Sequence, residues 1–166
     1  MKFLKSLVIL VVQLCVLVSG QCPNGFELND NSCYKVSALE ASWIEAKSFC
    51  RLLGSELLVI ETATEEAIVE GLLTKLHGSH IDEDYWASGA DIARENDWRW
   101  MTSDGVSFRM NYTHWGAGQP DNGGGNSNCL VIHFHGVRTI WNDTLCSQLH
   151  SFICEARAQE QEVIVG

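Results

Sequence analysis

The placement of its cysteines constrains the fold of this chain more than any other feature of the sequence. Cys15 lies in an apolar N-terminal run, and six more follow: Cys22, Cys33, Cys50, Cys129, Cys146 and Cys154. An even set favours disulfides in an oxidising compartment, whereas a structural zinc site would need close Cys-x-x-Cys pairs, which this sequence lacks. We expect a disulfide-stapled domain, although spacing alone leaves about 15 pairings open.

The first 20 residues have the order of a secretory signal peptide. Two lysines precede an apolar run from Leu7 to Val18, and the small residues Ser19 and Gly20 follow it. The run is shorter than the ~20 apolar residues that a membrane-spanning helix needs. We therefore expect a secreted, extracellular protein with no membrane span, in which residues 1–20 are removed.

The mature chain would be strongly acidic. The full sequence has 11 basic and 21 acidic residues, a net charge of −10, and removal of Lys2 and Lys5 with the signal lowers this to −12. Such a charge argues against nucleic acid as a partner and suits cations. An acidic surface that is merely solvated would look the same.

The N-terminal half predicts a hairpin and two helices. Residues 25–36 alternate around a turn at 29–31, which is typical of a β-hairpin. Capping-box sequences at Ser42–Glu45 and Thr62–Glu65 begin two helices, the first ending at Gly54. Residues 57–60 between them are apolar and indicate a buried strand.

Short strand-like runs follow His77, at residues 85–87, 98–100, 129–134 and 151–154. A long polar stretch, 102–128, separates the second run from the third, and loops of this length in compact domains are usually functional or disordered. We predict an α+β fold, with two helices packed on a mainly antiparallel sheet. Residues 157–166 are expected to form a frayed tail.

Two oxygen-rich clusters are the strongest candidates for a site. Gln119-Pro-Asp121-Asn122 lies in the long loop, and Asn142-Asp143 precedes Cys146. Calcium prefers six to eight hard oxygen ligands, which carboxylates and side-chain amides provide. A cis Gln119–Pro120 bond would turn both neighbours toward one centre, although Gln-Pro-Asp alone is only a turn signal.

In this context the chain resembles the C-type lectin family from Cys22 to Glu155, particularly small secreted lectins of invertebrates. The motifs that carry the resemblance are the cysteine order, two helices, Trp98-Arg-Trp100, Tyr112, Trp115, Gln119-Pro120-Asp121, Trp141-Asn142-Asp143 and Phe152-Ile-Cys154-Glu155. The resemblance implies a long-form C-type lectin-like domain over residues 21–156. It also implies the disulfides Cys22–Cys33, Cys50–Cys154 and Cys129–Cys146.

The resemblance further implies how the site would work. In the family, residues at the positions of Gln119, Asp121, Asn142 and Asp143 hold a calcium ion, which two sugar hydroxyls also coordinate. Gln and Asp in this arrangement are associated with galactose rather than mannose. The implied function is calcium-dependent glycan recognition in innate immunity, and oligomers would add avidity, although the sequence shows no coiled coil.

Three departures from the family pattern keep other functions open. Ser127 stands where a glutamate is usual, which removes a charge and a ligand oxygen. At an auxiliary calcium site Asp91 and Glu95 match, but Asn122 and Asn128 replace acids. Glycines at 123–125 replace an aromatic residue that stacks on galactose. A calcium-independent protein-binding module and an acidic mineral-matrix protein active in biomineralisation are the alternatives.

The remaining candidates have simpler explanations. His133 and His135 alternate on a predicted strand and could bind zinc with His114 or His150, or could be ordinary strand residues. Ser103, Asp104 and His114 could form a hydrolytic triad on paper, but no nucleophile-elbow pattern supports it, so we do not expect an enzyme.

Aromatic and acceptor motifs complete the set. Trp98, Trp100, Trp115 and Trp141 could form a sugar platform, but the family resemblance implies that they are mostly core residues or loop anchors. Asn111 and Asn142 both begin glycosylation sequons. We expect a glycan at Asn111, because one on Asn142 would cover the calcium position.

Overall fold

The computed structural model describes residues 21–78 and 82–159. The expected signal peptide, with Cys15, and residues 160–166 of the expected tail lie outside the described residues. Within them the chain forms two α-helices, α1 (Trp43–Leu52) and α2 (Ala63–His77), and a short 3-10 turn, η1 (Gly123–Gly125). The strands are β1 (Glu27–Asn29), β2 (Ser32–Ala41), β3 (Glu56–Leu57), β4 (Asp82–Ala90), β5 (Arg99–Met101), β6 (Ser107–Arg109), β7 (Cys129–His135), β8 (Arg138–Thr144) and β9 (His150–Arg157).

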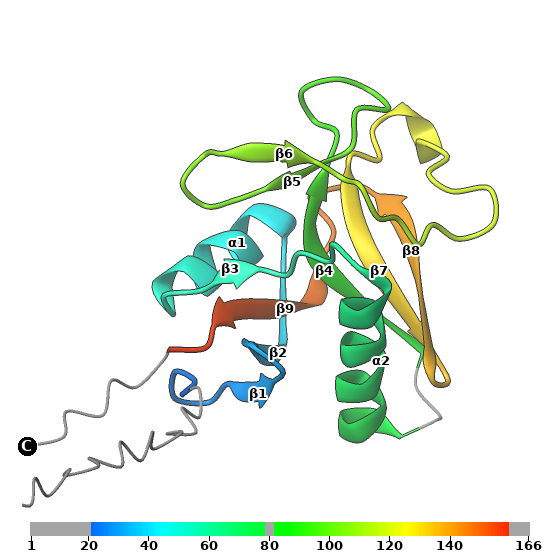
Figure 1. Ribbon diagram of the computed structural model, residues 1–166. Coiled ribbons are helices and arrows are strands. Elements are labelled where there is room, and N and C mark those ends of the chain that lie inside the picture. Colours follow the sequence, from blue (N-terminus) through cyan, green and yellow to red (C-terminus); the bar gives the residue numbers. More distant parts are fainter. Residues whose placement is uncertain (1–20, 79–81, 160–166) are drawn as a thin grey trace, which may run out of the picture.

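The strands form one mixed sheet around β4 and β9. The order β1-β2-β9-β4-β5-β6 runs across it, and β7 joins β4 to β8. The pairs are antiparallel except for β4 with β9, which is parallel. In Figure 1, α1 lies beside β9 and α2 beside the β7–β8 side, and the loop at residues 110–128 projects beyond one end of β7. This α+β architecture confirms the predicted fold class.

Both helices begin where their capping boxes predict. The Glu45 carboxylate accepts a hydrogen bond from the Ser42 backbone N–H (2.9 Å). At α2, Thr62 Oγ1 accepts from the Glu65 N–H (3.2 Å), and the Glu65 carboxylate accepts from the Thr62 N–H (3.0 Å). These reciprocal bonds satisfy backbone donors that the first helical turn leaves free. After α1, Gly54 adopts φ +70°, a left-handed conformation that glycine tolerates and that ends the helix.

Three disulfides hold the described chain together with the pairing that the family resemblance implied. Cys22–Cys33 closes the N-terminal hairpin, Cys50–Cys154 joins α1 to β9, and Cys129–Cys146 joins the start of β7 to the segment after β8. All but Cys22 and Cys146 have no exposed surface. The large buried side chains between the layers include Trp86, Trp100 and Trp141.

Several segments differ from the sequence-based expectation. Of the apolar run at 57–60, only Leu57 lies in a strand, β3 (Glu56–Leu57), although Leu58 and Ile60 are fully buried. The polar stretch contains β6, and Asn142-Asp143 lies inside a strand, β8, that was not predicted. Pairing also continues beyond residue 156, since Arg157 pairs with Ser32 and Gln159 bridges Gln21.

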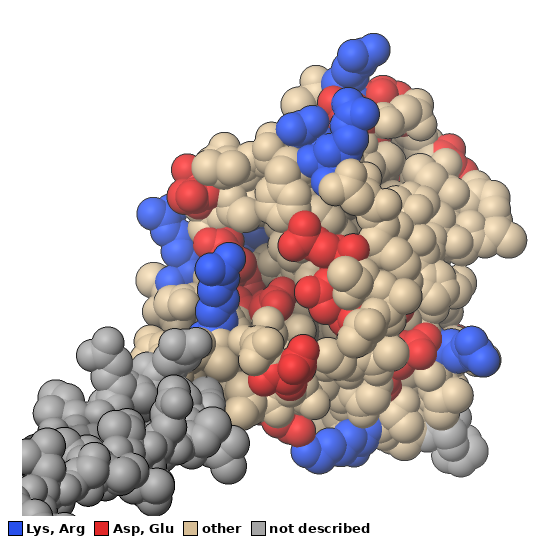
Figure 2. Space-filling view, viewed as in Figure 1, with Lys and Arg blue, Asp and Glu red and all other residues tan. Residues whose placement is uncertain are grey.

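Acidic side chains gather near the centre of the face seen in Figure 2, and most Lys and Arg side chains in that view lie toward its margins. None of the helices in the described part of the chain is long and apolar enough to span a membrane.

Candidate functional site

The loop between β6 and β7 positions the first oxygen-rich cluster. The Gln119–Pro120 peptide bond is cis. Gln119 Nε2 donates a hydrogen bond to Asp121 Oδ2 (3.3 Å), so the side chains on either side of Pro120 lie against each other. Asp121 is exposed, and its second oxygen is directed toward the glycine turn that follows, 3.3 Å from where a Cβ on Gly123 would lie.

Asp143 anchors this loop to the sheet. Its side chain is buried (8% exposed) on β8, and its two oxygens accept hydrogen bonds from the backbone N–H of Asp121 (2.9 Å) and of Asn122 (2.7 Å). The Gln119 side-chain oxygen in turn lies 3.4 Å from the Asp143 backbone nitrogen, which donates to it. Gln119, Asp121 and Asp143 therefore meet at one point, where the loop crosses β8.

Asn142 lies beside this group and contacts a different part of the loop. It precedes Asp143 on β8 and is half-buried. A Cβ at Gly116 would come within 3.0 Å of the Asn142 side-chain oxygen, which is tighter than ordinary van der Waals contact. Glycine at 116 thus lets the loop run close over Asn142. Of the four predicted residues, Gln119 and Asp121 lie in the loop segment 116–121, and Asn142 and Asp143 lie on the part of β8 that this segment crosses.

Ser127 makes two hydrogen bonds within the loop. Its side chain is buried (5% exposed), and its hydroxyl donates to the Gly123 carbonyl (2.9 Å). Its backbone N–H donates to the Asn122 side-chain oxygen (3.1 Å). The serine that replaces the usual glutamate therefore stabilises the turn at 122–127. The sequence alone did not indicate this role, because both bonds depend on the conformation of the glycine turn.

Two further carboxylates, Asp91 and Glu95, lie within electrostatic range of Asp143. Asp91 is 3% exposed, one of its oxygens accepts from the Asn96 N–H (2.8 Å), and the other is buried without a partner among the described residues. Burial, followed by repulsion from Asp143, raises the pKa of Asp91 against the lowering effect of the Asn96 bond. Desolvation and then the charges of Asp91 and Asp143 raise the pKa of Glu95. A cation nearby would offset this repulsion.

The donor set fits calcium in chemistry and charge. Asp121 and Asp143 carry two negative charges, and Gln119 and Asn142 add two neutral amide oxygens. Hard oxygen ligands of this kind are those that calcium prefers, and the two charges balance a divalent ion. The orphaned Asp91 oxygen is the kind of buried acceptor that a nearby cation would also satisfy.

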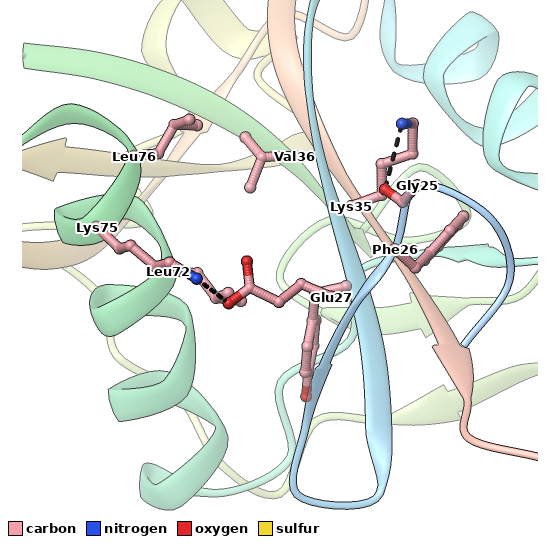
Figure 3. A pocket seen from close by; sticks show the side chains of 9 residues that line it. Gly25, Phe26, Glu27, Lys35, Val36, Leu72, Lys75 and Leu76 are labelled. Carbon is pink, nitrogen blue, oxygen red and sulfur yellow. Dashed lines mark hydrogen bonds and ion pairs between the residues drawn. The ribbon is translucent and has the colours of Figure 1, made fainter. Parts of the chain in front are cut away.

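A partly apolar pocket lies elsewhere on the domain. This pocket has a volume of about 540 Å³ and is lined by residues of the N-terminal hairpin and α2, among them Phe26, Tyr34, Val36, Leu72 and Leu76. Figure 3 shows it from close by. An ion pair between Glu27 and Lys75 crosses it. Its lining includes none of the four predicted site residues.

The histidines on β7 lie together, as their alternation predicted, but with different partners. Both pair with Asp82 on β4, at 3.2 Å for His133 and 3.5 Å for His135. His150 instead approaches Asp84 (3.9 Å), and His114 lies with Tyr112 and Glu66. Asp82 was not among the predicted ligands, although the alternating acids at 82 and 84, just before the strand-like run at 85–87, were a signal for it.

The structure also places the candidate triad, the tryptophans and the glycosylation sequon. Ser103 donates to Glu56, and among the described residues it makes no hydrogen bond to His114. Trp98, Trp100 and Trp141 are buried and pack edge-to-face with neighbouring tryptophans, which makes them core residues rather than a sugar platform. Asn111 is exposed, so it remains the predicted glycosylation site.

Comparison with known proteins shows the family to which this chain belongs. The family model of the lectin C-type domain matches residues 39–156. The chain therefore belongs to the C-type lectin family, whose domains are carbohydrate-binding and not enzymes.

The chain is similar to several individual proteins of known name or structure. Perlucin of Haliotis laevigata is 39% identical over 134 residues, which are 81% of this chain and 82% of perlucin. The carbohydrate-recognition domain of the human scavenger receptor C-type lectin is 32% identical, with a TM-score of 0.68 over 82% of this chain and 99% of that domain. A calcium-independent type II antifreeze protein shares the fold, with a TM-score of 0.69 at 22% identity, over 85% of this chain and 98% of that protein.

Proposed function

We propose that this chain is a secreted, calcium-dependent lectin for galactose-type glycans, with Gln119, Asp121, Asn142 and Asp143 as the calcium and sugar ligands. The observation that carries the proposal is the meeting of Gln119, Asp121 and Asp143 where the loop crosses β8. A bound calcium ion would supply a Lewis-acidic centre for two neighbouring sugar hydroxyls.

The side chains around the ion would select the sugar. Carboxylate oxygens of Asp121 only accept hydrogen bonds, whereas the Gln119 amide can donate through Nε2 and accept through Oε1. Asp121 would therefore accept a hydrogen bond from one sugar hydroxyl, and Gln119 could donate a hydrogen bond to the adjacent hydroxyl. The galactose preference itself rests on the family resemblance. Because glycines at 123–125 provide no stacking ring, affinity per site would be weak and oligomers would raise it.

Affinity chromatography tests the proposal. We expect the purified chain to bind galactose resin in calcium, to bind mannose resin less, and to be released by chelator. Asp121→Asn should lose this retention, because it removes one of the two charges at an exposed position. Glu61→Gln is the matched control, since it removes one exposed carboxylate charge outside the proposed site. Galactose retention that survives chelator would overturn the proposal.

A calcium-independent protein-binding module is the second candidate. Its specific support is that the loop is already held by its own bonds: both Asp143 oxygens accept backbone N–H groups, and the Ser127 hydroxyl caps Gly123. Under this alternative, calcium would leave the melting temperature unchanged and neither resin would retain the protein. A mineral-matrix role would appear as adsorption to calcium carbonate that Asp121→Asn leaves intact.

A further inference from the structure

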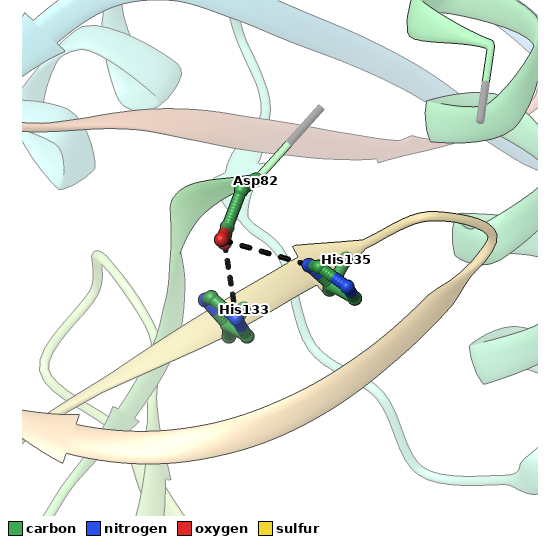
Figure 4. A group of neighbouring side chains, drawn as sticks. All are labelled: Asp82, His133 and His135. Carbon is green, nitrogen blue, oxygen red and sulfur yellow. Dashed lines mark ion pairs between the residues drawn. The ribbon is translucent and has the colours of Figure 1, made fainter. Parts of the chain in front are cut away.

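A second cluster of ligand atoms lies at the opposite end of β7 from the proposed calcium site. Asp82 stands opposite His135 in the antiparallel β4–β7 ladder, and Asp84 stands opposite His133. The two imidazole rings project from one face of the strand and are nearly parallel, with an interplanar angle of 7°. In Figure 4 the Asp82 carboxylate points toward both rings.

The spacing of these atoms fits a small tetrahedral metal ion. One Asp82 oxygen is 3.2 Å from His133 Nε2, and the other is 3.5 Å from His135 Nδ1. One ligand atom from each residue can be chosen so that all three lie within 4.8 Å of one another. Zinc bonds of about 2.0–2.1 Å at tetrahedral angles place neighbouring ligand atoms roughly 3.3 Å apart. Small side-chain rotations would bring the three atoms to that spacing.

Asp84 orients one of the two rings. Its carboxylate lies 2.9 Å from His133 Nδ1, on the side of the ring away from Asp82. A carboxylate that accepts the Nδ1 proton leaves the Nε2 lone pair directed at the metal position, which is the usual arrangement of metal-bound histidine. The neighbouring cavity of about 210 Å³, lined by Asp82, Asp84, His133 and His150, has room for a water molecule.

We propose that Asp82, His133 and His135 bind a zinc ion, with water as the fourth ligand. Two imidazole nitrogens and one carboxylate are a common ligand set for zinc, whereas calcium requires more ligands, all of them oxygen. The site does not depend on the proposed lectin function. Leu130, which pairs with Asp143, and His135 are separated by roughly 17 Å along the strand, from a rise of about 3.3 Å per residue.

Calorimetric titration of the untagged mature chain with zinc chloride tests the proposal. We expect one zinc ion to bind, and His135→Gln to abolish this binding. His135 is 75% exposed, so the variant should fold normally. Asp84→Asn should weaken binding by about 10- to 100-fold, because it removes the orienting carboxylate. His114→Gln is the matched control, since it removes a histidine outside the cluster.

Two results would overturn the site. They are failure of the wild-type chain to take up one equivalent of zinc, and uptake by His135→Gln that equals that of wild type. Excess calcium should not displace the zinc, and Asp121→Asn should retain it. Failure of the wild-type chain to bind galactose resin, with zinc uptake intact, would therefore refute the lectin proposal and leave the zinc site standing.

Discussion

The two ends of β7 carry different chemistry because they are built in different ways. At the Cys129 end, a loop folds over β8, and oxygen ligands meet only because backbone N–H groups bind Asp143. At the His135 end, nitrogen and oxygen ligands stand on two paired strands, and register alone brings them together. The first site depends on the loop conformation and the second on the sheet. Mutations should therefore be able to abolish binding at one site and leave the other intact.

Asp143→Asn should have the largest effect and should act at the loop end alone. The carboxylate accepts two backbone N–H groups and carries one charge of the proposed calcium site. An amide presents a donor to one of those N–H groups, so we expect a loss of about 1–3 kcal/mol in the free energy of unfolding and no calcium-dependent galactose retention. Urea unfolding and resin binding measure these effects. Concurrent loss of zinc uptake in the folded variant would contradict the separation of the two ends.

Glu66→Ala should destabilise β8, the strand that pairs with β7 along its length. Glu66 on α2 is 3% exposed and accepts hydrogen bonds from the hydroxyl of Thr139 and from Trp141 Nε1 (3.0 Å) on β8. Removing it leaves a buried indole N–H without a partner, which costs about 1–3 kcal/mol of stability. Thermal unfolding measures the loss, with the exposed Glu61→Ala as control. A change in zinc or sugar affinity beyond that expected from unfolding would show that α2 positions one end directly.

Ser127→Ala should have a smaller effect, restricted to the loop. The substitution deletes the bond from the Ser127 hydroxyl to the Gly123 carbonyl, a contribution of about 0.5–1.5 kcal/mol. We expect calcium-dependent galactose binding to weaken by about 2- to 10-fold, since the turn beside Asp121 is less well ordered. Zinc titration should be unchanged. Equal affinity of the variant and wild type for galactose would mean that the turn does not support the ligands.

Glu66→Gln should produce the smallest change, visible as a pH dependence. Burial, against hydrogen bonds that lower it, raises the pKa of Glu66 above its ordinary 4.5. The folded state then holds this proton more tightly than the unfolded state, so its contribution to stability is full below about pH 4.5 and is lost as pH rises through the folded value. Glutamine does not titrate. Urea unfolding across this range should therefore give a shallower decline for the variant than for wild type.

The sequence predicted the elements that have strong local signals. Both capping boxes fixed the helix starts, because their side chains satisfy specific backbone donors, and the alternation of His133 and His135 placed both rings on one face. The family motifs indicated the disulfide pairing, which spacing alone left open. The strand predicted at 57–60 overlaps β3 at Leu57 alone, whereas β6 and β8 were not predicted, and β6 has too few residues for a periodic signal.

The candidate sites were less accessible to sequence reasoning. The meeting of Gln119 with Asp143 depends on a loop crossing between residues 24 positions apart. Asp82 joins the histidines only through the cross-strand register, which the sequence does not specify by itself. The hydrogen bond of Ser127 within the turn was not predicted, because it depends on the conformation of the glycine segment. Tertiary pairing, rather than local propensity, decided each of these three cases.

The disulfides also determine how the domain would respond to mechanical force. Tension applied between residues 21 and 159 enters through Cys22, crosses to Cys33, follows the chain to Cys50, and leaves across the second disulfide to Cys154. Residues 51–153 lie outside this covalent path. The loop over β8 and both ends of β7 would therefore remain shielded from the tension while the outer segments stretch, so a tethered domain could be pulled without extending the chain that forms either candidate site.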